Sequence, residues 1–178
     1  MKRIFFSMLM FVLLVETSTA QQEAQTISLA KGLQLRYAVI KSRLTEAAEK
    51  MPAAEFAFKP ATDSRSFAQL LAHAANRNLL WCSALRGESD PNKNDDIQAK
   101  SERVDVPKAE IVKALAGSFE YCDQAIARET DATLAKIASQ GQDRRARGLF
   151  ISGVIAHLNE IWGRTSVYLS LKGLPTPE

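Results

Sequence analysis

The chain has 178 residues, and its 23 lysines and arginines nearly balance its 20 aspartates and glutamates, which gives a formal net charge of +3. This balance argues against nucleic acid as a partner, because proteins that bind nucleic acid through their charge carry a strongly basic face. The length suits one domain that buries most of the surface its unfolded chain would expose.

Residues 1–20 are predicted to be a secretory signal peptide. Lys2 and Arg3 precede an apolar run from Ile4 to Val15, and Ser18-Thr19-Ala20 supplies the small residues of a cleavage site. The run is shorter than the ~20 residues of a membrane span. We therefore expect a mature domain of residues 21–178, periplasmic or secreted, with no stable membrane insertion. An uncleaved membrane anchor is the alternative.

Helical periodicity dominates the rest of the chain, and no run shows the alternation of a strand. Pro52 ends the first helix, Ser66 and Gln69 have the spacing of a capping box at the start of the second, Pro107 opens the third, and Gly173 closes the fourth. The four amphipathic helices are expected at residues 26–50, 66–85, 107–128 and 144–171.

Four helices of this length predict an all-α fold, a four-helix bundle. The connection over residues 88–105 is polar and is interpreted as a loop. It is long enough to travel back along a helix of about 30 Å, so the second and third helices are expected to run in the same direction. Short links elsewhere make the other neighbours antiparallel, which gives an up-down-down-up order.

The two cysteines bear on this order. Cys82 and Cys122 lie at similar distances from the starts of the second and third helices, so parallel helices would bring them to the same height. In an oxidising compartment they would then form a disulfide. The alternative is two buried thiols that pack as small hydrophobic groups.

His73 and His157 are the candidate metal ligands. They are the only histidines of the sequence, and each lies in an apolar helical run. We expect both to point inward, as the metal ligands of helical bundles do. A catalytic metal site needs three protein ligands and an open position. The position one turn after His157 is Ile161, which cannot ligate. The alternative for each histidine is a packed, hydrogen-bonded residue.

Other side chains allow further interpretations. Glu160 is a candidate carboxylate ligand or a solvated residue. The basic run of Arg144, Arg145 and Arg147 suits either an anion site or, more simply, a solvated face.

Trp81, Trp162 and Tyr168 are predicted to be core or rim aromatics. A metal-free mechanism would use His157 as a base aligned by Arg164 or Tyr168. The sequence has no glycine-rich phosphate loop, paired-cysteine zinc pattern or nucleophile elbow.

Several segments together resemble the DinB-like (DinB/YfiT) family of four-helix-bundle proteins. The resemblance extends over nearly the whole of residues 21–178. The segments that carry it are Tyr37–Lys41, Ala47–Pro52, Phe58–Pro60, Arg65–His73, Cys82–Glu88, Ala156–Gly163 and Val167–Pro175.

The resemblance implies a divalent metal held by three histidines, one on the second helix and two on the last. His73 and His157 match two of these positions, and Ile161 occupies the third. It also implies that some relatives are thiol-dependent transferases or isomerases.

Two hypotheses for the function follow. The favoured one is an exported DinB-like domain whose metal site is degenerate and which serves as a small-ligand-binding or structural module. The alternative is a divalent-metal-dependent enzyme, a thiol transferase or hydrolase, in which His73 and His157 hold Ni, Zn or Mn weakly. Glu160, water or substrate would then supply the third ligand. A homodimer is common among such bundles.

Overall fold

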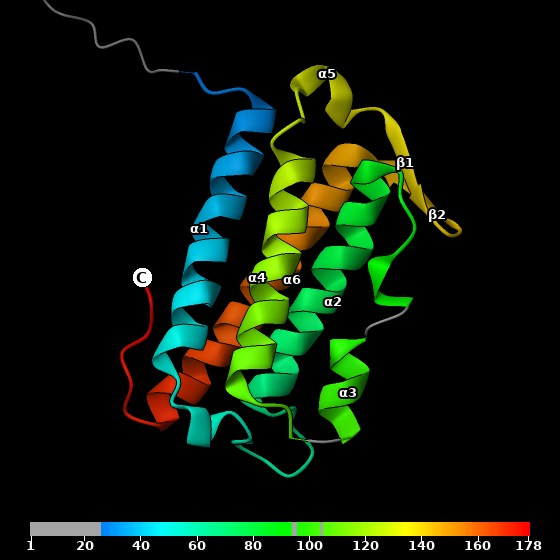
Figure 1. Cartoon of the computed structure of the whole chain (residues 1–178). Helices are drawn as coiled ribbons and strands as arrows, with labels where there is room; N and C mark the ends of the chain where they lie inside the picture. Colours follow the sequence, from blue (N-terminus) through cyan, green and yellow to red (C-terminus); the bar gives the residue numbers. More distant parts are fainter. Residues whose placement is uncertain (1–25, 94–95, 104) are drawn as a thin grey trace, which may run out of the picture.

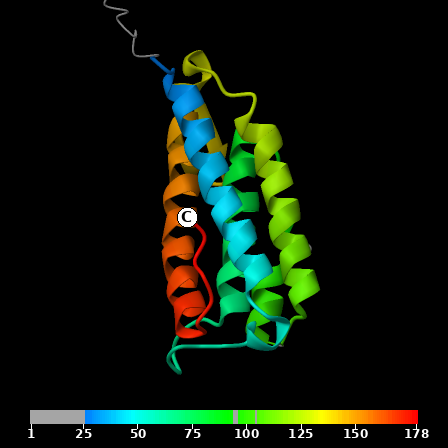
Figure 2. The same cartoon turned by 90° about the vertical axis from the view of Figure 1, so that its left-hand side faces the viewer.

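The structure, a computed structural model, describes residues 26–93, 96–103 and 105–178. The predicted signal peptide, residues 1–20, lies outside them. Four long helices pack side by side, with α2 and α4 running in one direction and α1 and α6 in the other (Figures 1 and 2). Their bounds are Leu29–Lys50 for α1, Phe67–Arg86 for α2, Lys108–Ile126 for α4 and Arg147–Leu171 for α6.

The ends of these helices follow the capping signals. Ser66 and Gln69 form the predicted capping box, in which each side chain bonds the other's backbone N–H. Gly87 and Gly173 follow α2 and α6 with φ angles of 69° and 67°. This left-handed conformation costs glycine nothing, so both helices stop sharply.

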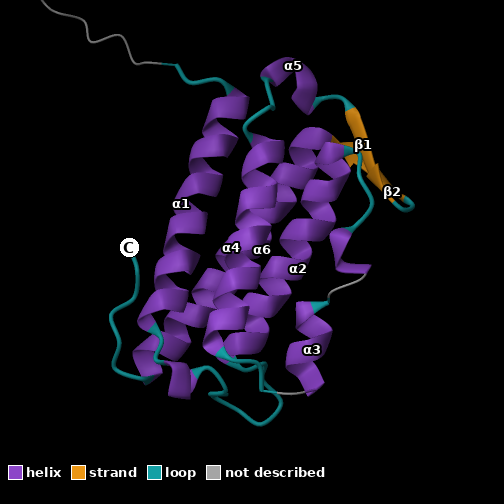
Figure 3. Ribbon diagram, viewed as in Figure 1, coloured by secondary structure: helices purple, strands orange, loops and turns teal. Residues whose placement is uncertain are grey.

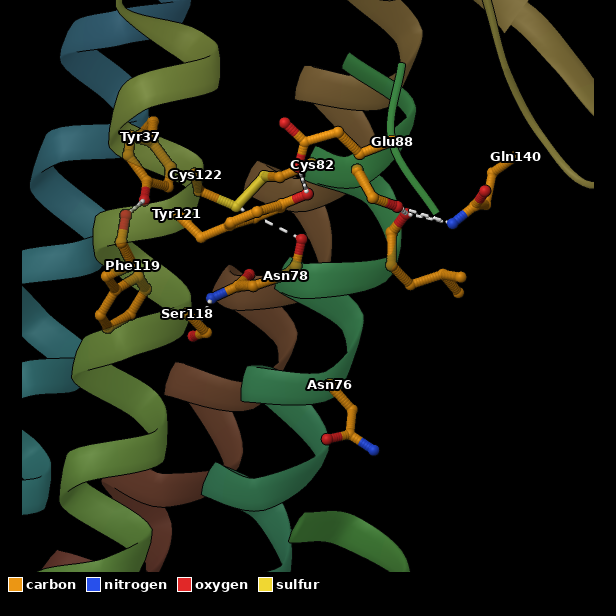
Figure 4. Close-up of a disulfide and its surroundings, with 12 residues drawn as sticks. Tyr37, Asn76, Asn78, Cys82, Glu88, Ser118, Phe119, Tyr121, Cys122 and Gln140 are labelled. Carbon is orange, nitrogen blue, oxygen red and sulfur yellow. Dashed lines mark hydrogen bonds between the residues drawn. A yellow bond between two sulfur atoms is a disulfide. The ribbon is translucent and has the colours of Figure 1, made fainter. Parts of the chain in front are cut away.

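A disulfide between Cys82 and Cys122 joins α2 to α4 (Figure 4). The two Cα atoms are 5.3 Å apart, and both side chains are fully buried. Antiparallel helices would have separated these positions by several turns. The disulfide therefore agrees with the parallel direction of α2 and α4 and settles the choice between a bridge and two thiols.

The connections contain short elements that the sequence interpretation missed (Figure 3). The segment assigned to a loop, residues 88–105, includes a helix, α3. The last helix was predicted to begin at residue 144, but residues 144–146 belong to a strand that pairs with β1. The additional elements are η1 Ala53–Glu55, η2 Pro91–Lys93, α3 Ile97–Arg103, α5 Asp131–Leu134, β1 Ile137–Gln140 and β2 Asp143–Ala146.

The two strands form an antiparallel hairpin with Ile137 opposite Ala146. Gly141 turns the chain with a φ angle of 58°. The Gln140 side chain anchors the hairpin to α2 by donating a hydrogen bond to Ser83 Oγ over 2.6 Å (Figure 4). This contact between distant segments supports a hairpin whose strands are only four residues long and show no clear alternation.

The core lies between the four long helices, whose apolar faces meet. Its largest fully buried side chains are Phe67, Phe119, Phe150, Ile40, Leu44, Met51, Leu70, Leu71, Ile111, Leu115, Ile126 and Ile151. Among the described residues, no helix combines the length and hydrophobicity needed to cross a membrane.

Candidate functional site: a histidine pair between two helices

His73 on α2 and His157 on α6 meet where these helices pack together. Their ring centroids are 4.8 Å apart, and the ring planes are inclined at 83°, an edge-to-face contact. His73 is 9% exposed. The structure thus brings together the two residues that were singled out from the sequence, although 83 positions of chain separate them.

A hydrogen bond from α3 sets the tautomer of His73. His73 Nδ1 is 2.8 Å from Gln98 Oε1. The amide nitrogen of Gln98 donates to Glu102, which turns the amide oxygen toward the histidine. Because an amide oxygen only accepts, Nδ1 carries the proton and Nε2 keeps its lone pair.

His157 has a similar arrangement. Its Nδ1 is 3.5 Å from Glu160 Oε2, a longer contact with a group that also only accepts while it is ionised. Its Nε2 is buried and has no hydrogen-bond partner among the described residues. The Trp81 ring packs edge-to-face on the imidazole at 5.6 Å between centroids. Buried polar atoms without a protein partner are rare, so this nitrogen is an unused hydrogen-bond acceptor at the pair.

The surroundings favour neutral rings. Burial lowers the pKa of His73 below 6.5, the hydrogen bond to Gln98 opposes this, and Arg65 and Arg77 lower it further. Burial also lowers the pKa of His157, and so does the neighbouring His73, while Glu160 acts in the opposite direction. At neutral pH the site therefore holds two uncharged imidazoles next to cationic side chains.

Ile161 lies one helical turn beyond His157, and its side chain is buried, with 1% exposure. An aliphatic group at this position fills the space of a third ligand and offers no lone pair. Among the described residues, no three His, Cys, Asp or Glu side chains gather in a way that could hold a metal ion. The donor set at the pair thus consists of two nitrogens, one fewer than protein metal sites normally use.

The other candidates on α6 have partners of their own. The Glu160 carboxylate is half exposed and accepts a hydrogen bond from Arg164 over 2.6 Å, so its main contact is on the solvent side. The Tyr168 hydroxyl donates to the backbone oxygen of Arg65 over 2.6 Å. Neither Arg164 nor Tyr168 therefore aligns His157 as a base.

The basic run has mainly structural contacts. Arg147 forms an ion pair with Glu129, whose side chain is 2% exposed. Arg145 pairs with Asp143 within the same strand. Arg144 is exposed on β2. Arg147 thus anchors the start of α6, a role that no feature of the basic run indicated in advance.

Trp81 and Trp162 are partly buried at the rim of the core, as expected. Trp81 packs on His157 and also lies next to Gly153 on α6, where an added Cβ would make an ordinary van der Waals contact with the indole ring at 3.9 Å. Trp162 packs under the guanidinium of Arg43 at 4.8 Å. Only Trp81 belongs to the histidine site.

Two residues near the pair were not predicted. Gln98 orients His73, but it lies in the segment interpreted as a loop, where its contact with α2 could not be foreseen. Arg65 precedes α2 and is close enough to lower the pKa of His73. Its position next to the capping box was the only signal available in the sequence.

Comparison with known proteins agrees with this architecture. A crystal structure of a DinB-like protein from Bacillus cereus superposes with a TM-score of 0.67 at 14% identity, over 83% of this chain and 95% of that one. A conserved protein from Enterococcus faecalis gives a TM-score of 0.64 at 15% identity, over 80% and 96%.

A mycothiol-dependent maleylpyruvate isomerase gives a TM-score of 0.58 at 14% identity, over 76% of this chain but only 59% of the isomerase. No curated protein sequence matches significantly. The model of the DinB superfamily matches residues 37–163, well over half of the sequence. The chain therefore belongs to the DinB superfamily.

Proposed function

We propose that this protein is an exported DinB-like module that binds a small molecule between α2 and α6, at a histidine pair that no longer forms a three-ligand metal centre. Export rests on the predicted signal peptide of residues 1–20. The two imidazoles offer hydrogen-bond acceptors to a ligand in a site that is partly closed to solvent.

The replacement of a third ligand by Ile161 carries the proposal. This side chain is 1% exposed and packs into the core, so a metal ion at the pair would have only two protein nitrogens. Water or a loosely placed carboxylate would have to complete its coordination. The residues present therefore do not fit the three-histidine centre, and no step of the proposed function uses a metal.

The retained histidines explain what the site still does. His73 and His157 each face an oxygen through Nδ1, and the Nε2 atom of His157 is buried without a partner among the described residues. A buried acceptor of this kind costs free energy as long as it stays unpaired. A ligand that donates a hydrogen bond to it recovers that cost.

The same contacts favour a second candidate, a divalent-metal-dependent enzyme. Metal-bound histidines usually present one nitrogen to the ion and bond the other to an oxygen acceptor. His73 with Gln98 and His157 with Glu160 have this arrangement. Tight metal binding by the unaltered protein would therefore favour the enzyme over the module.

Elemental analysis separates the two functions. The purified protein is incubated with nickel, zinc or manganese, desalted and compared with His73→Ala and Ile161→His. The module predicts far less than one metal per chain in the unaltered protein and in His73→Ala, and near-stoichiometric metal in Ile161→His.

Near-stoichiometric metal in the unaltered protein that disappears in His73→Ala would overturn the proposal in favour of the enzyme. An Ile161→His protein that folds normally by circular dichroism but holds no metal would show that the pair and residue 161 do not face one site.

A further inference from the structure

A cavity of about 600 Å³ lies where α2 begins and α6 ends, about one helical turn from His73 and about two from His157 along these helices. Its walls include Arg65 and Leu70 from the start of α2 and Arg164 and Val167 from the end of α6. Leu70 lies three residues before His73 on α2, close to one helical turn, or about 4.5 Å along the axis. The cavity and the histidines therefore line the same side of the α2–α6 junction.

Arg65 is the notable charge in this cavity. Its side chain is half-buried and makes no ion pair or hydrogen bond with any residue that the structure describes. The guanidinium offers five donors in a rigid fork, so the Arg65 side chain can bind an anion in the cavity without first breaking an ion pair. Arg65 also lowers the pKa of His73, which places its charge near the pair.

The remaining charges at the cavity leave it weakly positive. Arg164 also lines it, but its guanidinium is shared with Glu160 on the outer surface. Asp63 lines the cavity without an ion pair to Arg65 within 4 Å. Two arginines against one aspartate leave a net charge of +1 on the cavity walls, which suits one added negative charge.

The shape of the donors favours a planar anion. A guanidinium fork matches a carboxylate with two parallel hydrogen bonds. A phosphate carries more charge and usually binds to several backbone N–H groups, as at a glycine-rich loop. Here the capping box already occupies the first N–H groups of α2, while Leu70 and Val167 provide apolar wall for a carbon chain.

We propose that the ligand of this module is a small organic carboxylate, whose carboxylate group binds Arg65 in the cavity and whose body extends toward His73 and His157. This inference rests on the proposed function, because it names the chemical class of ligand for the same α2–α6 site. Arg164 assists by adding positive charge, and Asp63 opposes binding.

The test is a titration of the ¹⁵N-labelled protein followed by NMR, with succinate, the neutral succinamide and inorganic phosphate as probes. Succinate is expected to bind in a saturable way and to shift the signals of residues 63–70 and 164–168. Arg65→Gln is expected to weaken succinate binding by about tenfold or more. Asp63→Asn is expected to strengthen it, because it removes the only acidic side chain of the walls.

Arg36→Gln is the matched control, since Arg36 is exposed on α1 and lies outside the cavity. It removes the same charge and should leave binding unchanged. Opposite effects of Arg65→Gln and Asp63→Asn cannot come from a general loss of structure, so together they would support the carboxylate site.

Equal binding of succinate and succinamide, or no effect of Arg65→Gln, would overturn the inference but leave a ligand-binding module in place. Stronger binding of phosphate than of succinate would also overturn it. If the proposed function as a ligand-binding module is wrong, the unaltered protein will retain metal. That result comes from the elemental analysis and not from this titration.

Discussion

The ion pair between Arg147 and Glu129 is expected to be among the largest single contributions of a charged residue to the stability of this fold. Glu129 has 2% side-chain exposure and accepts hydrogen bonds from the Arg147 guanidinium and from Thr133 Oγ1, the latter over 2.7 Å. Arg147→Met removes the cation and leaves the carboxylate buried. Breaking a buried pair in this way costs about 3–5 kcal/mol, a large share of the ~5–15 kcal/mol that stabilises a typical domain.

The pH dependence of the free energy of unfolding provides a second test of this prediction. Burial pushes the pKa of Glu129 up, but the hydrogen bonds from Arg147 and Thr133 outweigh it and hold the pKa below 4.5. The stabilisation is therefore present above pH 4.5 and is lost as the pH falls through the lowered value. Without Arg147, burial dominates and raises the pKa above 4.5. The stability gap between the two proteins should then narrow on acidification.

Urea denaturation at pH 7.5 and pH 4 measures both effects. Arg144→Met is the control, because it removes an exposed arginine three residues away and should change stability by no more than about 0.5 kcal/mol. A loss below about 1 kcal/mol in Arg147→Met at pH 7.5, similar to that of the control, would refute the argument that Glu129 depends on Arg147.

Three other predictions concern the histidine pair, residue 161 and the disulfide between α2 and α4. Because the pKa values of His73 and His157 are lowered in the folded protein, the unfolded chain binds protons at a higher pH than the folded chain does. The free energy of unfolding should therefore fall as the pH drops from about 6.5 toward the lower folded values. In urea titrations, His157→Gln should make this dependence on pH less steep. Ile161→His should gain about 2.7 kcal/mol when zinc is present at 100 times its Kd, seen as a rise in Tm that chelation reverses; an unchanged Tm would count against the site geometry. Reduction of the Cys82–Cys122 disulfide, which spans 40 residues, should cost about 4 kcal/mol in the chain-entropy model, and a loss near zero by urea denaturation in the presence of reductant would contradict that account.

The long helices were predictable because their signals are local. Each apolar stripe repeats with the helical period, and Ser66, Pro52 and Gly173 mark their ends within a residue or two of the observed bounds. The direction of α2 and α4 followed from loop length. The sequence was therefore sufficient for the helical class and for the order of the main elements.

The missed elements depend on contacts between distant residues. Helix α3 is seven residues long and mostly polar, and it is held by side chains of α2, such as Gln69, which donates to the backbone oxygen of Ser101. The hairpin is held against α2 by Gln140 of β1, which donates a hydrogen bond to Ser83 Oγ. No local pattern records these contacts. Gln98 and its hydrogen bond to His73 could not be predicted for the same reason, because this contact also joins residues distant in the sequence.

The histidine pair itself was predicted from two sources of unequal strength. The apolar surroundings of His73 and His157 indicated that both rings point inward. Their meeting was implied by the resemblance to DinB-like proteins, because no spacing in the sequence links residues on two helices. That residue 161 is not a histidine was readable directly from the sequence, and the structure adds that the Ile161 side chain is buried.

The central claim is that the pair holds two neutral imidazoles with free Nε2 atoms and no three-ligand metal centre. Nitrogen NMR of the protein labelled with ¹⁵N-histidine tests this most directly, since the two histidines of the sequence give one set of signals each. At pH 7.5 the account predicts protonated Nδ1 and unprotonated Nε2 in both rings, and no change on addition of one equivalent of zinc. Ile161→His should show shifted Nε2 signals under the same conditions. Shifts of both Nε2 signals in the unaltered protein on addition of one equivalent of zinc would contradict the account and establish a metal site.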